Sequence, residues 1–185
     1  MTDAASPAAP APAAPAADSP APIGPLAEIA ALLPARGGLI GLDLGTKTIG
    51  VACCDPERRV ATVVETVRRT KFTADAARLV ALANERRAVG FILGLPLNMD
   101  ASEGPRAQAS RAFARNFARL AGRPIALWDE RLSTVAVERA LIAADVSRAR
   151  RAAVVDQHAA AFILEGALAF LARIAANEAQ TGDAD

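Results

Sequence analysis

The sequence predicts an α/β fold in which a mixed sheet of five strands is flanked by helices. Three short β-rich runs, punctuated by glycine, follow one another from Gly38, which is typical of an antiparallel meander. Two later β-rich runs each follow a helical pattern, and right-handed βα crossovers place such strands parallel to a neighbour. Two more helices end the pattern. The expected order along the 185-residue chain is therefore βββαβαβαα.

The first half of the pattern contains the meander and one helix followed by a strand. Its strands are expected at residues 38–44, 49–54, 60–67 and 89–95, with turn chemistry at Asp55-Pro56-Glu57. The helix carries Ala76, Leu79, Val80 and Ala83 on one face. Thr73 is its expected N-cap, and Arg86 and Arg87 suit its negative C-terminal end.

The second half contains one more helix and strand and then the two closing helices. Pro105 suits the first turn of a helix that ends near Gly122 and carries Phe113, Phe117 and Leu120 on one face. The fifth strand is expected at 125–128. The closing helices are expected at about 134–144 and 152–175, with the basic loop SRARR between them.

Composition divides the chain into a tail, one domain and a short C-terminal extension. Eight of the twelve prolines lie in residues 1–36, which are otherwise mostly alanine, so we expect this segment to be disordered. The domain is expected at 37–176 and a flexible tail at 177–185. The tail lacks the basic start and apolar run of a signal peptide. No apolar run reaches the ~20 residues of a membrane helix, so a soluble protein without a membrane partner is expected.

The expected domain is basic. Residues 36–176 hold all 21 Lys and Arg but only 14 of the 20 Asp and Glu, which leaves a net charge of +7. Such an excess is compatible with a polyanionic partner. The adjacent Cys53 and Cys54 form neither a C-x-x-C redox pair nor a zinc motif, which favours reduced thiols in the cytoplasm.

Carboxylates at three places indicate chemistry. Asp43 lies in an otherwise apolar strand, where burial costs several kcal/mol unless the charge is paired or bound to a cation. Asp129 and Glu130 end the fifth strand, and because side chains alternate, only one of them can face Asp43. Both faces of a covered sheet are apolar, so periodicity leaves this choice open. Asp156 lies on a helix face of small alanines that can approach a strand closely.

Three oxygen ligands without clustered His or Cys favour Mg²⁺ or Mn²⁺ over zinc. Two such ions about 4 Å apart would activate water and stabilise the leaving oxygen of a phosphodiester. His158 lies two residues from Asp156, about 200° around the helix, which favours a surface or interface role over a role at the metal site.

Several other residues are candidates for binding phosphate. Gly45, Thr46 and Lys47 form a turn after Asp43 where the backbone, a hydroxyl and an ammonium can contact a phosphate. Asn98 and Asp100 lie in the loop after the fourth strand. Their expected role is either a contact with metal or substrate, or an Asx turn. Basic side chains that suit phosphate contacts, or a solvated surface, are Arg111, Arg115 and Arg119 on one helix and Arg148, Arg150 and Arg151 before Asp156.

Four segments together resemble the YqgF/RuvX family, whose members are described as nucleases of pre-16S rRNA or as Holliday junction resolvases. They are GLDLGTKTIGVACCD, GLPLNMDASEGPRAQ, WDERLSTVAVER and VDQHAAAFIL, and the resemblance covers about residues 38–172. It implies an RNase H-like fold and a cytoplasmic, divalent-metal-dependent hydrolase that acts on pre-16S rRNA, within ribosomal precursor particles, or on branched DNA.

By motif match, the resemblance assigns catalysis and metal binding to Asp43, Glu130 and Asp156, which selects Glu130 over Asp129. Nucleic-acid binding is then expected at Gly45, Thr46, Lys47, Asn98, Arg106, Arg131, Arg150 and Arg151. One departure is that Thr48 stands where many members have arginine, so Lys47 alone would supply the basic contact there. RNA processing fits a monomer, whereas junction resolution favours a homodimer.

Two other functional classes fit part of the pattern. Actin-like ATPases and sugar kinases also have Asp-x-Gly-Thr after a strand, but they need two such domains around a nucleotide. A non-catalytic RNA-binding module on the same fold would be expected to lose the acidic set, and all three acidic residues are present here.

Overall fold

The computed structural model describes residues 19–132 and 148–182, without the side chains of 148–157 and 181–182. The strands are β1 (Ile23–Pro25), β2 (Leu39–Leu44), β3 (Thr48–Cys54), β4 (Ala61–Arg68), β5 (Gly90–Leu95) and β6 (Ile125–Asp129). The helices are α1 (Leu26–Ile29), the short 3-10 helix η1 (Ala30–Leu32), α2 (Phe72–Glu85), α3 (Pro105–Ala121) and α5 (Arg148–Gly182). The helix expected at 134–144 lies outside the described residues.

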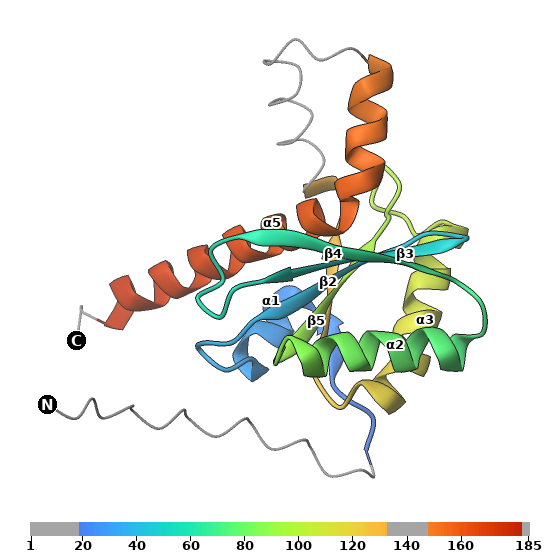
Figure 1. The fold of residues 1–185 in the computed structure, drawn as a ribbon. Coiled ribbons are helices and arrows are strands. Elements are labelled where there is room, and N and C mark those ends of the chain that lie inside the picture. The colour runs from blue at the N-terminus through green and yellow to red at the C-terminus, as the bar shows by residue number, and fades with distance from the viewer. Residues whose placement is uncertain (1–18, 133–147, 183–185) are drawn as a thin grey trace, which may run out of the picture.

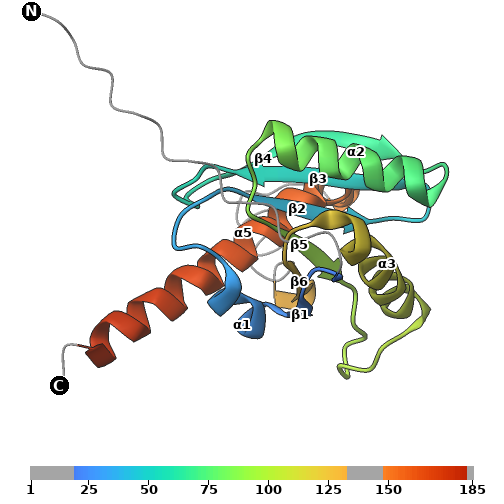
Figure 2. The same cartoon turned by 90° about the horizontal axis from the view of Figure 1, so that it is seen from below.

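The strands form one mixed sheet in the order β1-β6-β5-β2-β3-β4. Strand β3 is antiparallel to β2 and β4, as the meander predicted, whereas β5 is parallel to β2 and β6 is parallel to β5. Helices α2 and α3 cover one face and α5 crosses the other, as Figures 1 and 2 show. The predicted α/β class with its mixed, helix-flanked sheet is therefore confirmed, with six strands in place of five.

The sixth strand lies in the segment that was expected to be disordered, and that expectation is wrong for the described part of it. β1 pairs in parallel with β6, with Ile23 opposite Ile125. Leu26 and Ile29 follow it and are each only 3% exposed. The Arg58 side chain donates hydrogen bonds to the carbonyls of Pro34 and Gly37. A composition averaged over the proline-rich segment conceals these few ordered residues, and residues 1–18 lie outside the described part.

Strand alternation sorts the core into two clusters, one on each face of the sheet. On the α2 and α3 face, Ile40, Leu42, Ile49, Val51, Phe91 and Leu127 pack with the helices, and the Phe91 and Phe117 rings meet edge to face at 4.9 Å. On the α5 face, Leu39, Ala52, Ile92, Ala126 and Trp128 pack with α5 and α1, and Trp128 meets Phe170 at 5.7 Å. A residue's place in a strand therefore tells which face its side chain occupies.

Helix α5 is longer than the expected 152–175 and continues past the expected domain end at 176. Its segment His158–Gln180 has the length and the mean hydropathy, 1.8, of a membrane span, which the short apolar runs did not lead us to expect. Ala160, Ile163, Leu164 and Ala167 of this segment are buried against the sheet. Packing against the sheet thus accounts for part of this apolar segment, since 33% of the window is buried.

Glycine on the α5 face lets this helix lie close to the strands. A Cβ atom on Gly41 of β2 would come within 2.8 Å of both the Ala160 carbonyl oxygen and the Leu164 Cβ. A Cβ atom on Gly50 of β3 would lie 3.4 Å from the Ala160 Cβ. Because Gly50 is paired with Asp43, Ala160 lies over the end of β2 that carries this aspartate.

The capping predictions were right for α3 and wrong for α2. Helix α3 has Pro105 in its first turn and ends at Gly122, whose φ of 58° is the left-handed conformation that glycine adopts easily. Helix α2 begins before Thr73, with Lys71 as its N-cap. The buried Asp75 carboxylate accepts hydrogen bonds from the backbone N–H and hydroxyl of Thr70, which stabilises this helix start from inside the first turn.

If residues 19–36 belong to the folded domain, truncating their buried side chains lowers its stability. We predict that Ile29→Ala lowers the free energy of unfolding by about 2–5 kcal/mol, because it removes buried methylenes and leaves a cavity. The matched change Leu32→Ala, at a side chain that is 54% exposed, should cost far less. Urea unfolding of both variants measures this. Equally small effects of the two changes would show that residues 19–36 do not contribute to the stability of the domain.

Candidate active site

Asp43 lies near the end of β2 on the face that α5 covers. Leu39 of the same strand is in the α5-side core, so alternation places Gly41 and Asp43 on that face too. Asp43 is half-buried, and a Cβ atom on its strand partner Gly50 would lie 4.0 Å from the Asp43 Oδ2. Because Gly50 has no side chain, there is space for other groups beside the Asp43 carboxylate.

Glu130 comes to the same place from β6. A Cβ atom on Gly94 of β5 would lie only 2.5 Å from the Glu130 Oε1, so the carboxylate rests directly on this glycine. Strand β5 lies between β6 and β2 in the sheet, which brings Glu130 towards Asp43. Sequence reasoning missed Gly94, although a glycine between Leu93 and Leu95 of a buried strand signals a close approach.

The two carboxylates act on each other electrostatically. Burial is the largest cause that raises the pKa of Glu130 from 4.5 to about 7, and the negative charge of Asp43 is the second. The positive charge of Arg106, an exposed residue in the first turn of α3, opposes the shift and is outweighed. Near neutral pH this pair therefore favours either a shared proton or a bound cation.

Asp129 lies on the opposite face of the sheet. Its strand neighbour Trp128 packs on the α5 side, so Asp129 points to the α2 and α3 side. There its carboxylate accepts hydrogen bonds from the Arg131 guanidinium at 2.6 and 3.0 Å, and this partner lowers the pKa of Asp129. The geometry thus separates the two acidic residues that periodicity could not separate.

Arg131 also holds the loop that follows β5. Its Nη1 donates hydrogen bonds to the carbonyls of Asn98 and Met99, at 3.3 and 3.2 Å. Within the loop, the Asn98 amide donates to the Ser102 hydroxyl, and Asp100 accepts hydrogen bonds from the Ser102 hydroxyl and backbone N–H. Asn98 and Asp100 therefore make the local turn that was one of their two expected roles.

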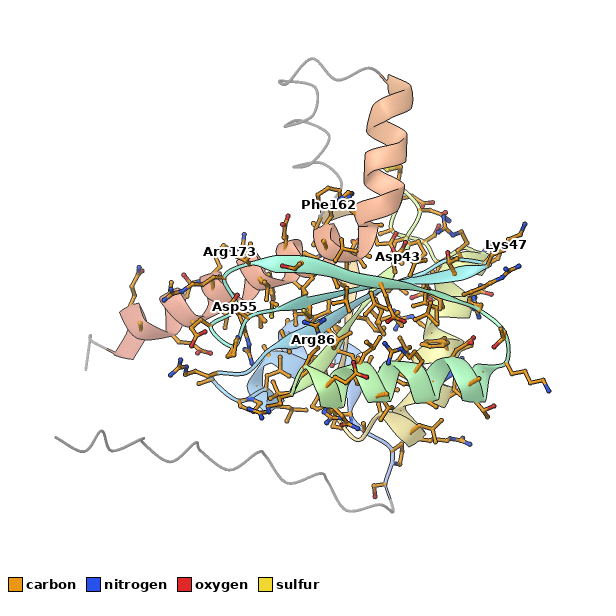
Figure 3. All side chains as sticks on the ribbon, in the orientation of Figure 1. Asp43, Lys47, Asp55, Arg86, Phe162 and Arg173 are labelled. Atoms are coloured by element: carbon orange, nitrogen blue, oxygen red, sulfur yellow. The ribbon has the colours of Figure 1, made fainter. Side chains whose placement is uncertain are left out.

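The turn after Asp43 is braced from β4. The backbone N–H of Gly45 donates to the Thr48 carbonyl, and the Arg69 guanidinium donates to the Gly45 carbonyl at 2.7 Å. The Arg69 backbone N–H bonds the Lys47 carbonyl. Thr46 and Lys47 stay exposed, and Figure 3 shows Lys47 at the tip of the hairpin with Asp43 further along the sheet. The role of Arg69 had no signal in the sequence.

The remaining predicted residues lie on α5. Asp156, Arg150 and Arg151 belong to this helix, but their side chains lie outside the described part of the structure. Asp156 is one turn before Ala160, the residue that lies over Gly41 and Gly50. The His158 ring lies beside Phe162, with 6.1 Å between the ring centres. Among the described residues, no three His, Cys, Asp or Glu gather as a metal site.

Known proteins resemble this chain in sequence and in fold. The RuvX family, described as "Holliday junction resolvase", matches residues 37–169. A relative from Rhodopseudomonas palustris (strain BisB5) is 73% identical over 147 residues, which are 80% of this chain and 92% of the relative. One from Nitrobacter winogradskyi is 73% identical over 148 residues, 80% of this chain and 91% of the relative. Both are named "Putative pre-16S rRNA nuclease".

Among solved structures, Thermus thermophilus RuvC in complex with a Holliday junction substrate resembles this protein with a TM-score of 0.51. The two are 17% identical, and the match covers 75% of this chain and 96% of RuvC, so the likeness concerns the fold. It bears out the RNase H-like class that the motifs implied. Sequence match, identity and fold agree that the chain belongs to the RuvX family.

Proposed function

We propose that this protein is a metal-dependent nuclease that hydrolyses phosphodiester bonds and matures the 5′ end of pre-16S rRNA in the cytoplasm. The observation that carries the proposal is the pair of Asp43 and Glu130, held together on the α5 face over Gly50 and Gly94. Two half-buried carboxylates, of which Glu130 has its pKa raised by burial and by the charge of Asp43, are a site for a cation. The names of the relatives from Rhodopseudomonas and Nitrobacter support rRNA as the substrate.

The donor set fits Mg²⁺ or Mn²⁺. Asp43 and Glu130 offer hard oxygen ligands, and the family resemblance adds a third from Asp156 of α5. When bound, such ions supply an activated water and stabilise the charge that develops on the leaving oxygen.

The chain's own residues have separate tasks around this centre. In the turn of Gly45, Thr46 and Lys47, the Gly45 N–H is taken by the Thr48 carbonyl, whereas Thr46 and Lys47 offer a hydroxyl and an ammonium to the substrate phosphate. Arg69 keeps that turn in place through the Gly45 carbonyl. Arg131 holds Glu130 in place indirectly. Its guanidinium bonds the carboxylate of Asp129, which precedes Glu130, and a carbonyl of the loop after β5.

The main competing substrate is branched DNA, as the description of the family indicates. Depletion of the protein should cause 16S precursors with unprocessed 5′ ends to accumulate, and the purified protein should cleave such RNA in preference to a four-way junction. The reverse preference, with a homodimer in solution, would favour junction resolution. Binding of either nucleic acid without any cleavage would favour the non-catalytic RNA-binding module.

Removing the acidic groups should abolish cleavage and leave the fold intact. We predict no detectable Mg²⁺- or Mn²⁺-dependent cleavage for Asp43→Asn, Glu130→Gln or Asp156→Asn, with nucleic-acid binding largely retained. The matched change Asp129→Asn, on the opposite face, should keep measurable cleavage, because it only loosens Arg131. Cleavage assays on labelled RNA with far-UV circular dichroism as the folding control test this. Activity in Asp43→Asn or Glu130→Gln would rule out the proposed metal site.

The raised pKa of Glu130 predicts how stability depends on pH in EDTA. The folded protein keeps a proton on Glu130 up to a pKa of about 7, whereas the unfolded chain releases it near 4.5. The folded state thus binds more protons between these values, so the Glu130 contribution favours folding at low pH and is lost as pH rises through that window. The melting temperature of wild type minus Glu130→Gln should therefore fall from pH 4.5 to pH 7. A difference that stays flat would show that Glu130 titrates normally.

Lys47 should contribute to substrate binding more than to chemistry. We predict that Lys47→Ala weakens binding of labelled single-stranded RNA and makes the negative slope of log K against log[salt] shallower by about 0.7, since one phosphate contact is lost. Lys47→Arg, which keeps the charge, is the control. A Lys47→Ala variant with an unchanged slope but slow cleavage would instead place this lysine in the chemical step.

A further inference from the structure

Strand β4 carries an arginine onto the face that holds the two carboxylates. Val67 of β4 is in the core on the α2 and α3 side, and Glu65 bonds Arg78 of α2, so the alternate residues Thr66 and Arg68 face the α5 side. The pairing from Thr48 to Val51 is regular, because the irregularity in β3 and β4 comes after Val51. This assignment therefore holds at Arg68.

The strand register places Arg68 close to the site. Gly50 is paired with Asp43 on one side and with Thr66 on the other, and Thr48 is paired with Arg68. Arg68 is thus two strands across and two residues along from Asp43, a Cα separation of about 12 Å from ordinary sheet spacings. Between them, Gly50 lies under Ala160 of α5, whereas Thr48 and Thr66 carry small, exposed side chains beyond it.

The charge of Arg68 is available to a ligand. Its side chain is exposed and makes no ion pair with any side chain in the described part of the chain. Arg78, by contrast, is engaged with Glu65 and Glu85, and Arg69 is engaged with the Gly45 carbonyl. Lys47 and Lys71 are exposed near the same end of the sheet, so the start of β3 and the end of β4 are positively charged next to the half-buried carboxylates.

We propose that Arg68 binds a backbone phosphate of the nucleic acid that flanks the phosphate held at Asp43 and Glu130. At its distance from Asp43 the guanidinium reaches a neighbouring phosphate and not the reacting one, so its contribution is to binding and to strand direction across β3 and β4. The substrate path then runs from the carboxylates over Thr48 to the end of β4. This inference rests on the proposed action on nucleic acid but does not require that the protein cleaves it.

The test measures binding by the full-length protein in EDTA, where metal-dependent cleavage does not proceed. The probes are a fluorescein-labelled single-stranded RNA and a labelled four-way DNA junction, each titrated at several salt concentrations by fluorescence anisotropy. Arg68→Ala should make the negative slope of log K against log[salt] shallower by about 0.7 on the RNA and by about 0.9 on the duplex arms of the junction. Arg68→Lys should keep the wild-type slope, because the charge remains.

The matched control is Arg59→Ala. Arg59 is an exposed arginine of the same hairpin, but its backbone N–H bonds Asp55, which Figure 3 shows at the end of the sheet opposite Lys47. This control should have the wild-type slope. An unchanged slope for Arg68→Ala, or an equal fall for Arg59→Ala, would overturn the inference, and so would binding too weak to measure. The nuclease proposal fails on a different observation, namely that the wild-type protein does not cleave nucleic acid in Mg²⁺.

Discussion

The close approach of α5 to the sheet governs the rest of this structure. Ala160 and Leu164 leave no room for a side chain at Gly41, and Glu130 and Ile163 leave none at Gly94. The helix places Ile163 over Gly94 together with the Glu130 carboxylate, and burial is the largest cause of the raised pKa of Glu130. The core packing and the electrostatics of the site are therefore one arrangement, and neither changes without the other.

The sequence predicted those parts of the fold that local pattern determines. The meander, both later strands and the caps of α3 follow from periodicity, proline and glycine, and Asp43 was identified because a carboxylate in an apolar strand is costly. The choice between Asp129 and Glu130 was beyond periodicity, because apolar residues cover both faces of the sheet and either residue could have pointed inward. The packing of Leu127 on the α2 and α3 side and of Trp128 on the α5 side gives the direction of alternation at this end of β6.

What the sequence did not predict depends on residues that are distant along the chain. Gly94 gains its meaning only when Glu130 lies on it, and Arg69 only when the Gly45 carbonyl is within reach. β1 was missed because three residues of strand have no periodicity of their own, and their pairing with β6 is made by backbone groups that composition does not report. The roles of all these residues follow from how the strands pair and from the sheet face on which each side chain lies. A short stretch of sequence contains neither.

The position of β1 also bears on where the domain begins. The family match begins at residue 37, after both β1 and α1. A protein shortened to that boundary would expose the backbone N–H and carbonyl groups of one edge of β6, and would uncover the apolar surface against which Leu26 and Ile29 pack. Unpaired sheet edges join readily with other chains. The few residues ahead of the shared domain thus act as a cover that keeps the strand leading to Glu130 from pairing with other molecules.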